Sequence, residues 1–278
     1  MPEIQVGTTV EISSRIRRLT APNGGPMTGP GTNTYLLGRD QVAVIDPGPL
    51  DASHTDSILR QVDAPVRWIL ATHTHPDHSP GVKALAAATG AEVLGRPAPT
   101  RGPQDQTFKP DRVLEHDALI ECPEFSLRAV HTPGHASNHL CYVLEDEKII
   151  FTGDHIMNGS TVVIAPPDGD MTAYIQSLKL LKEYDLQSIA PGHGDTMDSP
   201  QEVVDWIVEH RYQREKKVMR SVQKLGGADL EELVAVVYDD VNRLLHGVAK
   251  LSLEAHLIKL LEDGQVIRSG QHWTAAGD

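Results

Sequence analysis

The sequence predicts a layered α/β fold for residues 1–200 and a small helical appendage for residues 201–278. In the first part, short apolar runs with the period of a strand alternate with segments of helical period, which is the pattern of layered α/β proteins. In the second part the periodicity is helical and ends in one hairpin, which predicts a winged-helix-like domain. Hydrophobic residues make up 40% and charged residues 23%, so the composition is that of a folded globular protein rather than a disordered or fibrous one.

Strands are predicted where large apolar and β-branched residues run between turn residues, and helices where apolar residues recur every three or four positions. A stretch rich in glycine and proline, residues 22–31, predicts a surface loop. The predicted strands are residues 10–16, 34–37, 42–45, 66–71, 91–94, 127–130, 140–144, 148–151 and 188–190. The predicted helices are residues 54–62, 81–89, 174–184, 201–225, 230–237 and 253–261, with a closing hairpin over 262–274.

The balance of charge argues against polyanionic partners. Asp and Glu number 38 against 25 Lys and Arg, which gives a net charge of −13. A field of that sign opposes binding to nucleic acid but leaves room for a local basic patch. One candidate patch is a stripe at spacings of three and four on the helix 201–225, which we interpret as a solvated face. It comprises Arg214, Lys217, Arg220 and Lys224.

Other features of the sequence favour a cytoplasmic protein that does not enter membranes. No apolar run approaches the ~20 residues that a spanning helix needs. Residues 1–5 have neither the basic nor the apolar region of a secretory signal. The 2 cysteines, Cys122 and Cys141, form no CxxC pair, and Cys141 lies in an apolar run where we interpret it as a buried hydrophobic side chain.

The chain has 14 histidines, and their placement predicts a metal site. A predicted strand runs directly into residues 73–78, His-Thr-His-Pro-Asp-His. Side chains at positions i and i+2 of an extended segment point the same way, so His73 and His75 can bind one ion. The proline sets a turn that can aim Asp77 and His78 at a neighbouring point.

Three further candidate ligands each follow a predicted strand and a turn that contains glycine. They are His135, Asp154 and His193. Strand ends in open α/β folds gather at one edge of the sheet, so we expect these side chains to converge there. Imidazole nitrogen combined with carboxylate oxygen, without thiolate, suits zinc, iron or manganese.

Seven candidate ligands exceed the needs of one tetrahedral ion, so we expect two divalent ions, zinc first, with iron and manganese as alternatives. Two such ions lower the pKa of bound water and polarise a carbonyl or phosphoryl oxygen, which predicts hydrolysis by a metal-bridging hydroxide. Asp77 is the predicted catalytic residue, which orients that hydroxide or relays its proton. We assign His73, His75 and His135 to the first ion, Asp77, His78 and His193 to the second, and Asp154 to both.

This set of motifs resembles the metallo-β-lactamase-fold hydrolases. Their HxHxDH motif matches residues 73–78, and their later ligands match the other three candidates in the same order. The resemblance covers residues 10–200 and implies an αββα sandwich with a dinuclear site at one edge. It also implies that Asp46, in Val-Ile-Asp-Pro-Gly, supports the metal-binding loop by hydrogen bonding.

A narrower resemblance links the chain to the β-lactamase-like protein 2 branch of that family. Residues 167–171, Pro-Asp-Gly-Asp-Met, are similar to a segment of that branch, as are Tyr174, residues 177–178 and the helical appendage. The branch includes a mitochondrial single-strand RNA endonuclease and fungal thioesterases that release polyketides from carrier proteins. Both activities are therefore candidates for this chain.

We expect hydrolysis of an ester or thioester bond in a small-molecule, acyl-CoA or acyl-carrier substrate. Hydrolysis of single-stranded RNA is the alternative, but the net charge and an aromatic content of 4% count against it. β-Lactam hydrolysis and a non-catalytic metal- or DNA-binding role rank below both. Asn33, in a segment shared with the branch, and Ser160, in the loop after Asp154, are the expected substrate contacts. The family resemblance also leaves a homodimer open.

Overall fold

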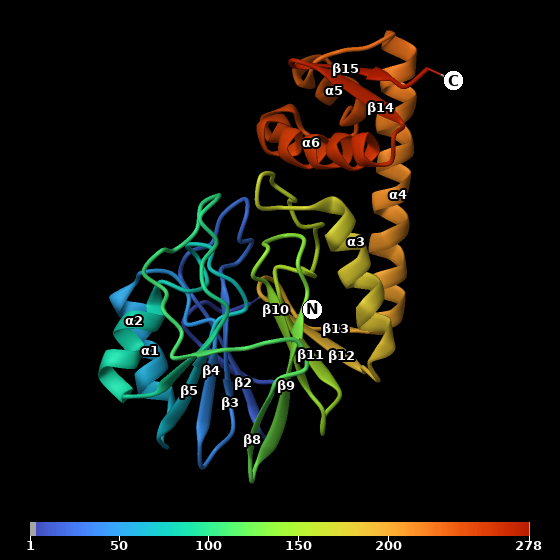
Figure 1. Cartoon of the computed structure of the whole chain (residues 1–278). Helices are drawn as coiled ribbons and strands as arrows, with labels where there is room; N and C mark the ends of the chain where they lie inside the picture. The colour runs from blue at the N-terminus through green and yellow to red at the C-terminus, as the bar shows by residue number, and fades with distance from the viewer. Residues whose placement is uncertain (1–3, 278) are drawn as a thin grey trace. The chain divides into compact units, whose positions relative to one another are not determined.

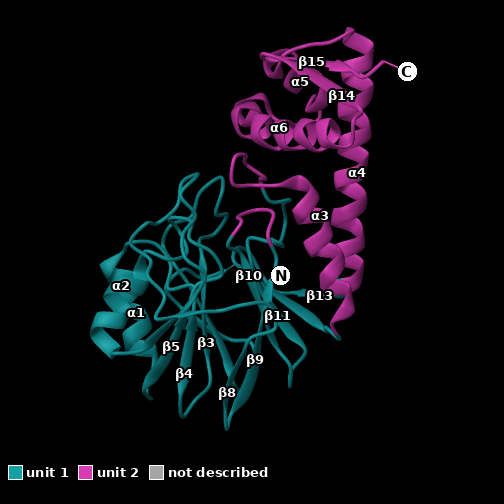
Figure 2. Cartoon of the chain, viewed as in Figure 1, with its two compact units in different colours: residues 1–132, 138–162, 185–200 teal, residues 133–137, 163–184, 201–278 magenta. Residues whose placement is uncertain are grey.

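The structure, a computed structural model, describes residues 4–277, and these form two compact units. Figure 2 shows the first unit, residues up to 132 with 138–162 and 185–200, in teal. The second unit, in magenta, combines residues 133–137 and 163–184 with those from 201 onward. Two short segments that the sequence analysis assigned to the first domain thus belong to the second unit, and the domain boundary at residue 200 stays a prediction. Among the described residues, none of the helices combines the length and apolarity that a membrane span requires.

Seven strands of the first unit form one sheet, and two helices cover one of its faces (Figure 1). In sheet order the strands are β1 (Thr9–Glu11), β2 (Ile16–Thr20), β3 (Asn33–Leu37), β4 (Val42–Ile45), β5 (Val66–Leu70), β6 (Glu92–Gly95) and β7 (Arg112–Val113). The pairs from β1 to β4 are antiparallel, and the pairs from β4 to β7 are parallel. The helices α1 (Ala52–Gln61) and α2 (Gly81–Thr89) form the crossovers from β4 to β5 and from β5 to β6, as parallel pairing requires.

The second sheet of the first unit has six strands in the order β13-β12-β11-β10-β9-β8. They are β8 (Leu119–Cys122), β9 (Phe125–His131), β10 (Leu140–Leu144), β11 (Ile149–Gly153), β12 (Ser188–Pro191) and β13 (Met197–Asp198). β11 and β12 pair parallel, and every other pair in this sheet is antiparallel. Two of the predicted ligands, Asp154 and His193, follow the strands of this parallel pair.

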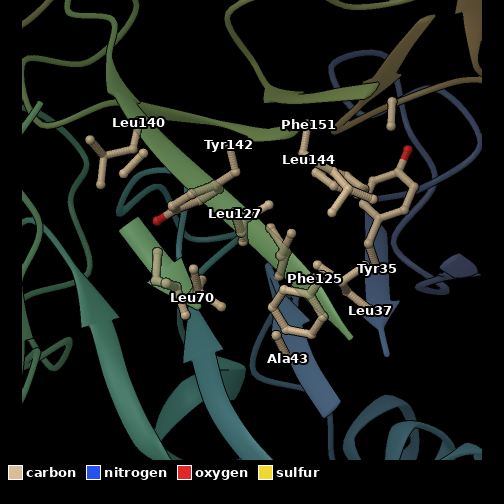
Figure 3. Close-up of a cluster of buried hydrophobic side chains, with 14 of the residues drawn as sticks. Tyr35, Leu37, Ala43, Leu70, Phe125, Leu127, Leu140, Tyr142, Leu144 and Phe151 are labelled. Atoms are coloured by element: carbon tan, nitrogen blue, oxygen red, sulfur yellow. The ribbon is translucent and has the colours of Figure 1, made fainter. Parts of the chain in front are cut away.

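An apolar core lies between the two sheets (Figure 3). Side chains at alternate positions of each strand enter it, as the two-residue period of a strand dictates. Tyr35 of β3 meets Phe151 of β11 there, with ring centroids 5.0 Å apart. The intervening residues of the first sheet, among them Leu36 and Val44, face α1 and α2 instead. The helices and the second sheet therefore cover opposite faces of the first sheet.

The second unit is helical and ends in a hairpin. Its elements are α3 (Met171–Leu180), the 3-10 helix η1 (Leu181–Glu183), α4 (Pro200–Leu225), α5 (Leu230–Val237), the 3-10 helix η2 (Arg243–Leu245), α6 (His246–Glu262), β14 (Val266–Ser269) and β15 (His272–Ala275). Val222 of α4, Leu233 of α5, Leu257 of α6 and Trp273 of β15 share one buried apolar cluster. The predicted α/β sandwich with a helical, winged-helix-like appendage is confirmed.

The structure corrects several element boundaries. The single strand predicted for residues 10–16 is wrong, because the chain turns there and forms β1 and β2. The hydroxyl of Ser13 stabilises that turn by accepting hydrogen bonds from the backbone N–H groups of Arg15 and Ile16, both at 3.2 Å. Three strands, β7, β8 and β13, are missing from the prediction, and two of them have only 2 residues each. A strand that short shows no periodicity in the sequence.

Candidate metal centre

Loops that follow three strands of the first unit meet at one edge of the sandwich. The loop after β5 carries residues 73–78. Asp154 follows β11 directly, and His193 lies shortly after β12. β11 and β12 are parallel neighbours, with Gly153 opposite Pro191, so their carboxyl ends bring these two side chains together.

Four side chains from these loops form one group of candidate ligands: Asp77, His78, Asp154 and His193, with donor atoms within 4.8 Å of one another. His193 Nε2 lies 3.2 Å from Asp77 Oδ2 and 3.2 Å from Asp154 Oδ1. His78 Nε2 lies 3.4 Å from Asp77 Oδ2 and 3.2 Å from Asp154 Oδ1. The structure thus brings together the three ligands predicted for the second ion and the predicted bridging carboxylate. Their role as ligands stays a prediction.

The two imidazole nitrogens of this group have the environment of metal ligands. Nε2 of His78 and Nε2 of His193 are buried and have no hydrogen-bond partner among residues 4–277. A buried polar atom in that condition costs roughly 1–3 kcal/mol unless a ligand satisfies it. A tetrahedral ion bound at about 2.0–2.2 Å holds neighbouring ligand atoms about 3.3–3.6 Å apart, close to the observed separations of 3.2 and 3.4 Å. The donor set therefore fits a divalent ion.

The other ring nitrogen of each histidine is held by the protein. His78 Nδ1 donates to Asp46 Oδ2 at 2.9 Å, and His193 Nδ1 donates to the carbonyl oxygen of Gly31 at 3.1 Å. Such a bond fixes both the orientation of the ring and its tautomer, and leaves Nε2 as the atom that can bind an ion. Asp46 is itself held by Thr72, whose backbone N and hydroxyl donate to its two oxygens at 2.7 and 2.8 Å. These contacts are what the predicted supporting role of Asp46 requires.

Electrostatics in the group favour added positive charge. Burial lowers the pKa of His193, but Asp154 and Asp77 outweigh burial and raise that pKa to about 10. Burial likewise lowers the pKa of His78, whereas Asp77 and Asp154 raise it well above its usual value. Burial raises the pKa of Asp77 and of Asp154, and the two histidines lower both well below the usual range. The buried carboxylate of Asp154 and the half-buried one of Asp77 thus favour positive charge beside them, which a divalent ion supplies as well as protons do.

His73 and His75 lie on the same loop and converge as their i, i+2 spacing predicts. His73 Nε2 and His75 Nδ1 are 3.0 Å apart, so both nitrogens are within reach of a single ion. The hydroxyl of Thr72 lies 3.0 Å from the other nitrogen of His73. The ring of His139 stacks on that of His73, with centroids 5.0 Å apart and planes inclined by 29°. These contacts leave His73 little freedom to rotate.

Two residues of the site escaped the sequence analysis. Thr72 holds Asp46, and its position directly before the histidine motif is the signal that could have identified it. Gly192 packs so closely that a Cβ there would come within 2.9 Å of Asp154 Oδ1 and 2.9 Å of the His78 ring. The Pro-Gly-His sequence pointed to this glycine only as a turn residue, because its close approach depends on the other loops.

Two other predicted site residues, His135 and Ser160, contact backbone carbonyl oxygens. His135 belongs to the segment 133–137 of the second unit, where its Nδ1 donates to the carbonyl oxygen of Val163 at 2.7 Å. Ser160 is exposed, and its hydroxyl lies 3.4 Å from the carbonyl oxygen of Thr161. The predicted substrate contact of Ser160 stays a prediction.

The predicted substrate contact of Asn33 is wrong for its side chain. Asn33 is 0% exposed. Its amide nitrogen donates to the carbonyl oxygens of Pro191 and Gly194 at 3.0 and 2.8 Å, and its amide oxygen accepts from Thr20 at 2.8 Å. Both hydrogens and the oxygen of the amide are therefore committed to the protein, and the side chain holds the loop that carries His193.

Two of the four cations of the basic stripe on α4 pair with carboxylates within the second unit. Arg214 forms two hydrogen bonds with Asp240, at 2.8 and 2.9 Å, and Lys217 pairs with Asp239 at 2.5 Å. Charge that is already paired attracts phosphate weakly. This supports the interpretation of the stripe as a solvated helix face.

Comparisons with known proteins agree with this description. The family profile of the metallo-beta-lactamase superfamily matches residues 27–193, and that of the beta-lactamase associated winged helix domain matches residues 230–273. The chain is 30% identical over 275 residues to a beta-lactamase-like protein 2 homolog of Drosophila melanogaster, which spans 94% of this chain and 92% of that protein. It is 31% identical over 285 residues to the atrochrysone carboxyl ACP thioesterase of Aspergillus chevalieri, spanning 96% and 85% of the two chains. The predicted resemblance to the β-lactamase-like protein 2 branch is confirmed.

A solved structure supports the fold. The crystal structure of a beta-lactamase domain protein from Burkholderia ambifaria superposes with a TM-score of 0.82 at 17% sequence identity. The match covers 98% of this chain and 94% of that one, so both units have counterparts there.

Proposed function

The chain belongs to the metallo-beta-lactamase superfamily and is a hydrolase of that family, and from this premise we propose that it cleaves an ester or thioester bond at a dinuclear metal centre. The observation that carries the proposal is the group formed by Asp77, His78, Asp154 and His193, in which two buried imidazole nitrogens face carboxylate oxygens but have no hydrogen-bond partner among residues 4–277. In the proposed centre, Asp77, His78 and His193 hold one ion. Asp154 holds both ions, and His73, His75 and His135 hold the other.

The bridging role of Asp154 is supported by its position. Its Oδ1 lies 3.2 Å from Nε2 of His78 and 3.2 Å from Nε2 of His193. Gly153, directly before it, packs against Thr72 so closely that a Cβ there would come within 2.4 Å of the threonine hydroxyl. Because Thr72 precedes His73, the loop of Asp154 lies against the start of the histidine motif.

The inclusion of His135 is supported by the motif order and by the tether of its segment. Thr132 N donates to the carbonyl oxygen of His139 at 3.0 Å, which closes the loop at the ends of β9 and β10. His135 lies three positions after Thr132, so the chain can carry the histidine at most about 11 Å from that closure.

Two divalent ions held by these residues would lower the pKa of water to near neutrality and would stabilise negative charge on a carbonyl oxygen. Asp77 is the residue of the four with the most open side chain, 26% exposed, against 10% for Asp154 and 2% for His193. The neighbouring histidines lower the pKa of Asp77, so its carboxylate stays charged at neutral pH and can orient the attacking water by accepting a hydrogen bond from it. We assign it that role, which Asp154 is too enclosed to fill.

The net charge of the chain and the names of similar proteins support an ester or thioester substrate. Names of relatives include an ACP thioesterase, and this favours a small-molecule or acyl-carrier thioester. The net charge of −13 and the pairing of Arg214 and Lys217 with carboxylates work against binding of a long single-stranded RNA. Zinc is the ion we propose first, because the donor set combines imidazole with carboxylate. A cytoplasmic location stays a prediction.

The test combines metal content with a substrate panel. The full chain, loaded with Zn²⁺ and freed of excess ion, is expected to retain about two ions and to cleave a thioester. Asp154→Ala is expected to lose both activity and ion content, whereas His116→Ala, a change at a histidine with 43% of its side chain exposed, is expected to lose neither. Uptake of fewer than two ions by the wild type overturns the dinuclear centre. Cleavage of single-stranded RNA without cleavage of a thioester or an ester overturns the substrate class.

A further inference from the structure

Polar side chains of β2 and β3 point from the first sheet toward the loop that carries His193. The register of the two strands places Arg18 opposite Tyr35 and Thr20 opposite Asn33. Adjacent pairs of this kind lie on the same face of a sheet. Three of these four residues make hydrogen bonds to residues 191–195, which belong to the second sheet and its following loop.

The loop is held first through its backbone. Tyr35 donates from its hydroxyl to the carbonyl oxygen of Pro191 at 2.8 Å, and Asn33 donates to the carbonyl oxygens of Pro191 and Gly194 at 3.0 and 2.8 Å. The backbone N of Asn33 also donates to the carbonyl oxygen of Gly192 at 2.8 Å. The backbone on both sides of His193 is thus fixed to the start of β3.

The loop is held second by an ion pair. Arg18 Nη1 donates to Asp195 Oδ1 at 2.6 Å, and the side chains are 4% and 25% exposed. A guanidinium so deeply buried needs a charged partner, since burial of an isolated charge is costly. The Nε of Arg18 has no hydrogen-bond partner among residues 4–277, so Asp195 carries much of that compensation.

Asp195 also connects the two loops that carry candidate ligands. Asn158, four residues after Asp154, donates from its side chain to the carbonyl oxygen of Asp195 at 3.0 Å. Its backbone N donates to the carbonyl oxygen of His193 at 3.4 Å. A displacement of Asp195 therefore disturbs His193 and the loop of Asp154 together.

We propose that Arg18 and Asp195 are positioning residues of the metal centre, which fix the His193 loop at the place where its imidazole meets Asp77 and Asp154. This inference rests on the proposed dinuclear function. It adds two residues outside the ligand set that decide how tightly the second ion, the one assigned to Asp77, His78 and His193, is bound. Neither residue touches the proposed ligand atoms, so both act through the backbone of residues 191–195.

The size of the effect follows from the way metal sites are supported. Residues that hold ligands in place typically contribute 10–100-fold to metal affinity. We expect Arg18→Met and Asp195→Asn each to weaken the binding of the second ion by about 10–100-fold. Because the two residues act through one another, the double variant is expected to lose about as much as either single variant.

The experiment is a competition titration of the metal-free full chain with Zn²⁺ against a chromophoric chelator, which resolves both ions. The matched control is Arg17→Met. Arg17 lies next to Arg18 on β2, is 7% exposed, and donates to the carbonyl oxygens of Gln61 and Gly38 at 2.5 and 3.3 Å, remote from His193 in the sequence. Arg17→Met tests the loss of a buried arginine from the same strand without the contact to Asp195. Cobalt absorption spectra of the loaded variants report the geometry around the second ion as an independent readout.

The proposal is supported if Arg18→Met and Asp195→Asn bind the second ion more weakly and keep the wild-type affinity for the first ion. It also requires that Arg17→Met binds both ions with wild-type affinity. Unchanged second-ion affinity in both test variants overturns it, as does an equal loss in Arg17→Met. A wild-type chain that binds a single ion overturns the dinuclear function instead. In that case hydrogen exchange of the peptide containing residues 191–195 tests whether Arg18 and Asp195 hold this loop. Faster exchange in Arg18→Met than in Arg17→Met supports the positioning role, and equal rates overturn it.

Discussion

Asp46 accepts a hydrogen bond from Nδ1 of His78 at 2.9 Å while its own backbone adopts a left-handed conformation, with φ of 52°. A left-handed φ is unfavourable for residues other than glycine, and aspartate and asparagine tolerate it best. The conformation turns the chain sharply after β4 and leaves the carboxylate facing Thr72 and His78. The fold thus accepts local backbone strain at the residue that orients a candidate ligand.

Asp46→Ala is expected to weaken binding of the second ion by about 10–100-fold, because His78 loses the partner that fixes its tautomer. Asp46→Asn, which tolerates the same φ but lacks the charge, is expected to lose less. Zn²⁺ competition titration measures both. The control is Asp51→Ala, which removes the N-cap of α1 and should cost about 1 kcal/mol of unfolding free energy with no change in metal affinity. Equal affinities for Asp46→Ala and the wild type would contradict the assignment.

Gly192→Ala is expected to reduce affinity for the second ion by at least about tenfold. Its Cβ would meet Asp154 Oδ1 and the His78 ring at 2.9 Å, so the loops that carry the ligands must move apart. Isothermal titration with Zn²⁺ checks this. Gly247→Ala is the matched control and should bind both ions normally, because no atom of residues 4–277 outside its own stretch of helix lies within 4 Å of the added Cβ. Normal binding by Gly192→Ala would show that the loops tolerate displacement.

Removal of the ions is expected to lower the thermal midpoint of the protein. A ligand that binds only the native state stabilises it by about 2.7 kcal/mol when its free concentration is 100 times its Kd. Differential scanning calorimetry with and without a chelator measures the shift. Asp154→Ala, which lacks the proposed bridging ligand, should show a much smaller response. A chelator that shifts both proteins equally would be acting elsewhere than at this centre.

The second unit is expected to lose stability in mild acid through His256. Burial lowers the pKa of His256 to about 4, even though Glu215 raises it, and Arg211 lowers it further. The ordinary pKa of histidine is 6.5. Above that pH His256 is neutral in both the folded and the unfolded chain, so it does not reduce the free energy of unfolding. As the pH falls from 6.5 towards 4 the unfolded chain binds the proton first, and stability falls by up to about 3 kcal/mol.

Chemical denaturation of the wild type and of His256→Gln at a series of pH values isolates this effect, since other buried groups are common to both. The variant is expected to show a shallower fall between pH 6.5 and 4, the window in which His256 titrates. Parallel curves would mean that His256 takes up its proton without unfolding. Its neighbour Glu215, whose Oε2 lies 3.7 Å from the ring, is the partner that would permit this.

The sequence by itself determined the α/β class, the helical appendage and the identity and order of the candidate ligands. These properties are local: helix and strand periods are read within a few turns of chain, and the ligands stand directly at strand ends. His73, His75, Asp77 and His78 lie within 6 consecutive positions, so their convergence needed one strand and one turn.

Only the tertiary structure decided which residues support those ligands. Arg18 and Asp195 are 177 positions apart, and no sequence pattern around either residue indicates that the two form an ion pair. Asn33 resembled a residue that lines the site, but the register of β2 and β3 turns its amide into the protein, toward Pro191 and Gly194. The physical reason is that such contacts depend on strand register and on the packing of two sheets, and a shift of one residue would send each side chain to the opposite face.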